Sequence, residues 1–111
     1  MDSAQSLRLG LNLQAADPLY KRAPTHDETG RPVSDFMMLI PGLRDLPQRD
    51  FVAKTHTIQS VLGAFADVVF ADLNVRLNLL WVSVRARPGI IMDIAVCMKF
   101  HVPEALIVCH K

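Results

Sequence analysis

The chain is poor in the residues that mark several specialised protein classes. Its two cysteines, Cys97 and Cys109, are too few for the disulfide framework of a small secreted protein, so we expect reduced thiols and a cytoplasmic location. Its five glycines are isolated from one another, which excludes a glycine-rich phosphate-binding loop. No other pattern in the sequence indicates a cofactor.

An excess of one charge and a long apolar run are also missing. Twelve basic and eleven acidic residues leave a formal net charge of +1, so charge predicts neither nucleic acid nor a membrane surface as a partner. No uninterrupted apolar run approaches the roughly 18 residues of a membrane span, and no basic region followed by an apolar one opens the chain. Half of the 111 residues are hydrophobic and 21% are charged, which predicts one soluble, folded domain.

The most informative stretch runs from Val68 to Arg87. Because side chains along a strand alternate between two faces, the position of the apolar residues reveals the pairing. They occupy odd positions from Val69 to Val75 and even positions from Leu80 to Ala86. In one straight strand the apolar residues cannot move from odd to even positions, so this stretch predicts a β-hairpin.

A two-residue turn at Leu77 and Asn78 accounts for the change, and Asn78 tolerates left-handed backbone geometry. A β-bulge near Leu77 is the alternative. The turn pairs Val75 with Leu80, Leu73 with Val82 and Ala71 with Val84. One hairpin face is then aliphatic. The other is solvated or meets a partner, and carries Phe70, Asp72, Asn74, Trp81, Ser83, Arg85 and Arg87.

The N-terminal part contains one strand-like segment and one long loop. Residues 6–14 alternate leucine with other residues, which predicts a half-buried edge strand or an arm exchanged with a second chain. Residues 15–32 have no periodicity and contain three prolines. Loops of this length are often functional or mobile.

A strand and a helix are predicted next. The contiguous apolar residues of 33–40 indicate a strand buried on both faces. Asp45 and Gln48 have the spacing of a capping box, with Pro47 in the first turn. The predicted helix ends between Gly63 and Asp67 and has one apolar side, formed by Phe51, Ile58, Val61, Leu62 and Phe65.

Residues 90–102 predict a second helix, although their β-branched residues leave a strand as the alternative. Only three of these thirteen residues are polar, so one stripe facing the sheet cannot account for all the apolar surface. We expect another copy of the chain or the N-terminal segment to cover the outer side, where we place Met98. Residues 105–110 indicate a last, mostly buried strand.

From residue 33 the predicted order is strand, helix, strand, strand, helix, strand. This is the ferredoxin-like α+β arrangement, an antiparallel sheet with both helices on one face, here with an additional N-terminal edge strand. We therefore divide the chain into residues 1–32, a strand with a long mobile loop, and residues 33–111, the ferredoxin-like domain. A superfold of this kind implies no function by itself.

Few residues are candidates for a metal site or a catalytic site. Cys97 and His101 stand one helical turn apart and could share a metal ion, but Cys109 and His110 are neighbours on a strand and point to opposite faces. A buried cysteine commonly serves as a small apolar side chain, so we predict no metal site. No set of residues completes a nucleophile, base and oxyanion arrangement, which favours binding over catalysis.

The remaining candidates are surfaces. Phe70, Trp81, Arg85 and Arg87 could stack single-stranded RNA or form a face-to-face dimer, and the RNA-recognition signature is missing. Small regulatory modules of this fold bind ligands near the turn that opens a helix, here 41–43 or 87–89. The sequence thus predicts a homo-oligomeric interaction or small-ligand-binding regulatory domain. The alternatives are a small enzyme with a site at a subunit interface and a single-stranded RNA-binding module.

Overall fold

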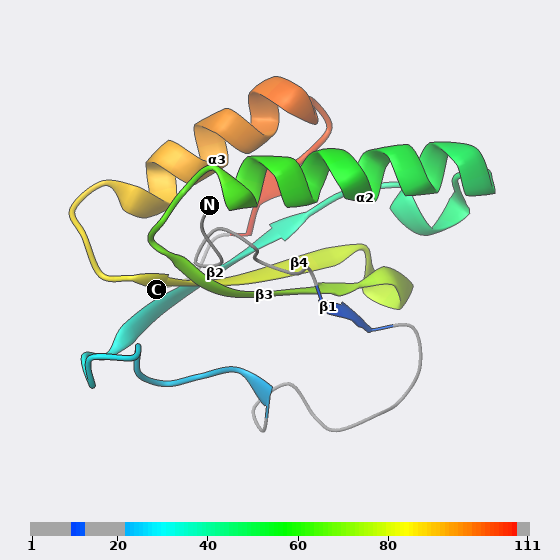
Figure 1. The fold of residues 1–111 in the computed structure, drawn as a ribbon. Helices are drawn as coiled ribbons and strands as arrows, with labels where there is room; N and C mark the ends of the chain where they lie inside the picture. Colours follow the sequence, from blue (N-terminus) through cyan, green and yellow to red (C-terminus); the bar gives the residue numbers. More distant parts are fainter. Residues whose placement is uncertain (1–9, 13–21, 109–111) are drawn as a thin grey trace.

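The computed structural model describes residues 10–12 and 22–108, which form one sheet with two helices packed on it (Figure 1). The sheet contains β1 (Gly10–Asn12), β2 (Val33–Leu39), β3 (Val68–Asn74), β4 (Leu79–Arg85) and β5 (Leu106–Ile107), in the order β1-β3-β4-β2-β5. The predicted α+β class is confirmed. Residues 6–9 and 13–21 and the pair Cys109–His110 lie outside the described residues, so the predictions made for them stay predictions.

The four strands from β2 to β5 pair antiparallel with their neighbours. β1 lies at the edge of the sheet and pairs parallel to β3 of the same chain, with Leu11 opposite Leu73. The described part of the N-terminal segment therefore forms an edge strand, and it is three residues long.

Helices α2 (Gln48–Gly63) and α3 (Ile90–His101) cover the same face of the sheet (Figure 1). The segment that was open to a strand interpretation is thus helical. The predicted capping box is wrong, because a single 3-10 turn, Leu43–Asp45, precedes α2. Gly42 opens that turn with a φ of 80°, Leu43 enters the core, and the Asp45 side chain stays 78% exposed. The cap of α2 is Pro47, which offers no side-chain hydrogen bond.

The hairpin forms, but its register differs from the prediction. Leu73 pairs with Leu80 and Ala71 with Val82, because four residues rather than two connect the strands. The Asn74 side chain accepts a hydrogen bond from the Leu77 backbone N–H over 3.2 Å, which closes a second 3-10 turn over Val75–Leu77. An even number of additional residues leaves the same side chains on each face, so the aliphatic face is correct, while the partners of Leu73 and Ala71 are each shifted by two.

The predicted left-handed geometry of Asn78 is confirmed by its φ of 57°. The irregularity in the pairing lies between Val68 and Phe70 rather than near Leu77. There an extra residue turns Val68 into the core and leaves Val69 only half-buried. Such a bulge changes which side chains face the core without breaking the strand.

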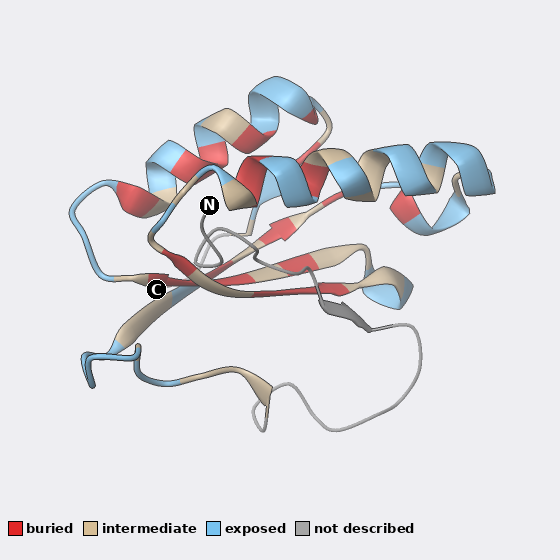
Figure 2. Cartoon of the chain, viewed as in Figure 1, coloured by how far each residue is buried: buried red, intermediate tan, exposed pale blue. Residues whose placement is uncertain are grey.

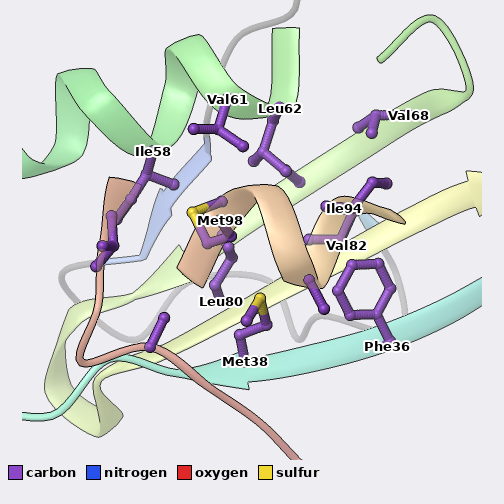
Figure 3. Packing of buried hydrophobic residues seen from close by; sticks show 14 of the residues in the cluster. Phe36, Met38, Ile58, Val61, Leu62, Val68, Leu80, Val82, Ile94 and Met98 are labelled. Carbon is purple, nitrogen blue, oxygen red and sulfur yellow. The ribbon is translucent and has the colours of Figure 1, made fainter. Parts of the chain in front are cut away.

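The core lies between the sheet and the two helices (Figures 2 and 3). Ile58, Val61 and Leu62 of α2 are buried, as predicted, and Phe51 and Phe65 pack against them. Most of the other buried residues come from the inner face of the sheet and the inner side of α3, and these include Phe36, Met38, Leu73, Leu80, Val82, Val84, Ile94 and Met98.

Two strands are less buried than the sequence indicated. In β2 the burial alternates, with Phe36 and Met38 in the core, Met37 half-buried and Asp35 exposed, because the helices cover one face of the sheet only. In β5 both Leu106 and Ile107 are exposed, at 49% and 43%. This strand pairs with β2 on one side and forms the edge of the sheet on the other.

Candidate functional site

The sheet face opposite the helices carries a buried polar network. Asp72 is 3% exposed and Ser83 is fully buried, so the expectation of a solvated face is wrong at these positions. The Trp81 indole N–H donates to Ser83 Oγ over 3.1 Å, and Ser83 donates to Asp35 Oδ1 over 2.7 Å. The Arg22 guanidinium lies 2.7 Å from Asp72 Oδ1. In the strand register Ser83 lies opposite Phe70 and Asp72 opposite Trp81, so the polar groups beside both aromatic residues already have partners.

Residues 22–32, which precede β2, fold against this same face of the sheet (Figure 1). Its turn is organised by Asp27 Oδ1, which accepts hydrogen bonds from the Thr29 hydroxyl and from the backbone N–H groups of Thr29 and Arg31. Gly30 completes the turn with a φ of 85°, a conformation that favours glycine. The turn therefore has one defined shape and presents the Arg31 side chain outward from it.

Arg85, at the end of β4, holds the turn to the sheet. Its guanidinium forms an ion pair with Glu28, lies 3.8 Å from Asp27 Oδ2 and donates to the Ala66 carbonyl. The Thr29 hydroxyl is the main cause of a lowered pKa at Asp27, and the Arg85 charge adds to it. Glu28 also has a lowered pKa, first through its own backbone N–H and then through Arg85. Both carboxylates are thus ionised at neutral pH.

A cleft of about 580 Å³ opens where this turn meets the end of β4 and the loop that leads into α3. Its lining combines three arginines with two aspartates and a few small or apolar residues: Asp27, Thr29, Arg31, Pro32, Asp67, Arg85, Ala86, Arg87 and Pro88. The volume falls within the range of about 300 to 1,000 Å³ that is usual for small-molecule sites.

Arg87 stands at the centre of this region. Its Nε donates to Asp67 Oδ2 over 2.8 Å, and this hydrogen bond is the main cause of a raised pKa at Arg87. Nη1 forms a longer ion pair with Asp93 Oδ2 over 3.7 Å, and this carboxylate also helps to raise the pKa of Arg87. A second cleft of about 350 Å³ adjoins at the start of α3 and is also lined by Arg87, together with Pro88 and Gly89. The turn at 87–89 thus lines two clefts, whereas the turn at 41–43 lines neither of them.

The outer side of α3 is an exposed apolar stripe of Met92, Val96 and Phe100, which are 60%, 61% and 80% exposed. Residues four apart in a helix share one side, so these three side chains are contiguous. The placement of Met98 on this side is wrong. Met98 is fully buried between the helices and the sheet, two residues from Val96 and therefore on the opposite side of the helix (Figure 3).

Cys97 and His101 lie together, as their spacing predicted, but without further ligands. Cys97 Sγ is 4.0 Å from His101 Nδ1, and that same nitrogen lies 3.1 Å from the Cys97 carbonyl oxygen. Within residues 10–12 and 22–108, no three histidine, cysteine or acidic side chains converge as a metal site would require. The Phe100 ring packs edge-on against His101, with ring centroids 5.1 Å apart.

Two of the predicted surface residues, Arg85 and Arg87, line one cleft. Phe70 and Trp81 lie elsewhere on the sheet, and Met98 lies in the core. Sequence reasoning missed Asp27, Thr29 and Arg31. The Asp-x-Thr-Gly pattern of residues 27–30 is typical of a turn organised by an aspartate side chain and was the available signal.

Comparisons with known proteins add no relative. The chain matches no protein-family model, no curated protein and no solved structure. Among the described residues, neither helix has the length and apolar character needed to cross a membrane.

Proposed function

We propose that this chain is a small regulatory interaction domain that acts as a homo-oligomer and pairs through the outer side of α3. The exposed stripe of Met92, Val96 and Phe100 carries this proposal. A contiguous apolar stripe with this exposure on a small domain commonly marks an interaction surface.

We further propose that residues 33–111 form a domain of the ferredoxin-like type and that residues 1–32 are an addition to it. The succession of strand, helix, strand, strand, helix and strand and the order β3-β4-β2-β5 support this assignment. The small number of cysteines supports a reducing, cytoplasmic location.

The arrangement of the stripe favours a second copy of the chain as the occupant. Most homo-oligomers are built on twofold axes, and a twofold axis perpendicular to a helix pairs it with its own copy in antiparallel orientation. With the axis at Val96, Met92 of one chain lies level with Phe100 of the other, four residues on either side. A thioether beside an aromatic ring is a favourable contact. The stripe is therefore complementary to itself.

Three side chains are not enough for a complete interface, since a stable one buries about 800 Å² on each partner. The neighbouring strand β5, which contacts α3, adds exposed Leu106 and Ile107. β5 also lies at the edge of the sheet, where pairing with a second chain is available. The helix stripe would then form the apolar centre of the interface and β5 its margin.

The test is the solution mass by light scattering for the wild type and for Val96→Lys. We expect an oligomer for the wild type and a monomer with unchanged circular dichroism for the variant, because a lysine at the axis places two like charges together. Val52→Lys is the matched control, since Val52 lies on α2, is 52% exposed and is outside the stripe. A monomeric wild type, or a Val96→Lys protein that stays oligomeric, would contradict the proposal.

A further inference from the structure

The cleft between the 27–31 turn and the end of β4 has a property that pairing through α3 does not explain. Three of its lining side chains are arginines, in a protein whose net charge is only +1. Two of them already have carboxylate partners. Arg85 forms ion pairs with Asp27 and Glu28, and Arg87 forms ion pairs with Asp67 and Asp93.

Arg31 is different. Its backbone N–H is fixed by Asp27 Oδ1 over 3.0 Å, but within the described part of the chain its guanidinium has no carboxylate or carbonyl partner. A guanidinium offers five N–H donors in a rigid plane. Among the described residues, the lining therefore contains one guanidinium without a carboxylate partner, held on a turn of defined shape.

Arg87 adds further donors on the same cleft. Its hydrogen bond to Asp67 uses Nε, and its Nη1 forms a longer ion pair with Asp93 Oδ2 over 3.7 Å. Among the described residues, Nη2 of Arg87 has no partner, while Nε and Nη1 hold the side chain in place. Two guanidinium groups with unused N–H donors, facing one concave space, are the arrangement that carboxylates and phosphates recognise.

From this geometry we infer a binding site for the oxyanion group of a small organic molecule, a carboxylate or a phosphate, held between Arg31 and Arg87. Pro32, Ala86 and Pro88 give the same cleft an apolar wall, which fits a ligand with a small apolar body beside its anionic group. The Thr29 hydroxyl already donates to Asp27, so it orients the turn and is not assigned to the ligand.

The experiment is a titration of the full-length, ¹⁵N-labelled protein with inorganic phosphate and, separately, with acetate, at constant ionic strength set by chloride. We expect saturable shifts of the backbone amide signals of residues 27–31, 85–87 and 89. Saturation by phosphate alone assigns a phosphate group, saturation by acetate alone assigns a carboxylate, and saturation by both supports a general oxyanion site. Saturation by neither overturns the inference.

Variants separate this site from general attraction of anions. Arg31→Gln removes the unmatched charge without breaking an ion pair among the described residues, and we expect about tenfold weaker binding, as for the loss of one charge-assisted contact. Arg87→Gln should weaken binding at least as much. Arg49→Gln is the control, because Arg49 is exposed on α2 and does not line the cleft. Equal affinity in Arg31→Gln and wild type, or equal losses in Arg31→Gln and Arg49→Gln, would overturn the site.

Discussion

The burial of Met98 gives a sharp prediction, because two residues of α3 that look alike in the sequence should behave in opposite ways. Met98 is fully buried, whereas Val96 is 61% exposed. Truncation of a buried methionine to alanine removes apolar contacts and leaves a cavity, at a cost of about 2 to 5 kcal/mol. Truncation of an exposed valine changes the free energy of unfolding by less than about 0.5 kcal/mol.

The total stability of a domain is only roughly 5 to 15 kcal/mol, so Met98→Ala should remove a large part of it. At about 4 °C or more for each kcal/mol, we expect Tm to fall by roughly 10 °C or more. Met98→Lys should not fold at all, because a buried charge without a partner costs considerably more than a lost contact. This outcome is the opposite of the sequence-based expectation, which placed Met98 on an outer surface.

The assay is urea unfolding followed by circular dichroism, with Met98→Ala, Val96→Ala and wild type compared at one protein concentration. A fixed concentration matters, because association through α3 would itself stabilise the folded chain. If Met98→Ala unfolds within 0.5 kcal/mol of wild type, the packing of α3 described above is wrong. Leu80→Ala, which truncates a core residue of β4, shows the loss expected of a buried site.

Two further predictions concern an ion pair and a turn. The Glu104 carboxylate accepts a 2.6 Å hydrogen bond from Lys54, which lowers the pKa of Glu104 below the usual 4.5. The pair therefore stabilises the fold above about pH 4.5, and this contribution disappears as the pH falls through the lowered pKa. In Glu104→Gln, urea midpoints measured from pH 7 to pH 3 should fall less steeply than in wild type, and identical slopes would contradict the pairing. Asn78 has a φ of 57° and accepts the Arg44 backbone N–H over 2.8 Å. Asn78→Ala should therefore cost about 1 to 2 kcal/mol and Asn78→Gly less, because glycine adopts the left-handed conformation without strain; equal losses by urea unfolding would refute the role of the backbone geometry.

Local patterns in the sequence were enough for the class and order of the elements. Strand alternation and helix periodicity depend on neighbouring residues alone, and they correctly predicted the hairpin, its aliphatic face, both helices and the left-handed Asn78. The nearly continuous apolar character of residues 90–101 also correctly predicted apolar surface on the outer side of α3.

The tertiary structure decided which residues of each pattern meet. Most residues of α3 are apolar, so helical periodicity could not distinguish the buried Met98 from the exposed Val96. The packing of α3 against the sheet decides which of the two is buried. The hairpin register depended on the hydrogen bond by which the Asn74 side chain closes a 3-10 turn. A two-residue turn would place the same side chains on each face, so strand alternation could not distinguish the two connections. The cleft unites residue 31 with residue 87, more than fifty positions apart, and only the folding of the 27–31 turn against the end of β4 brings their charges together.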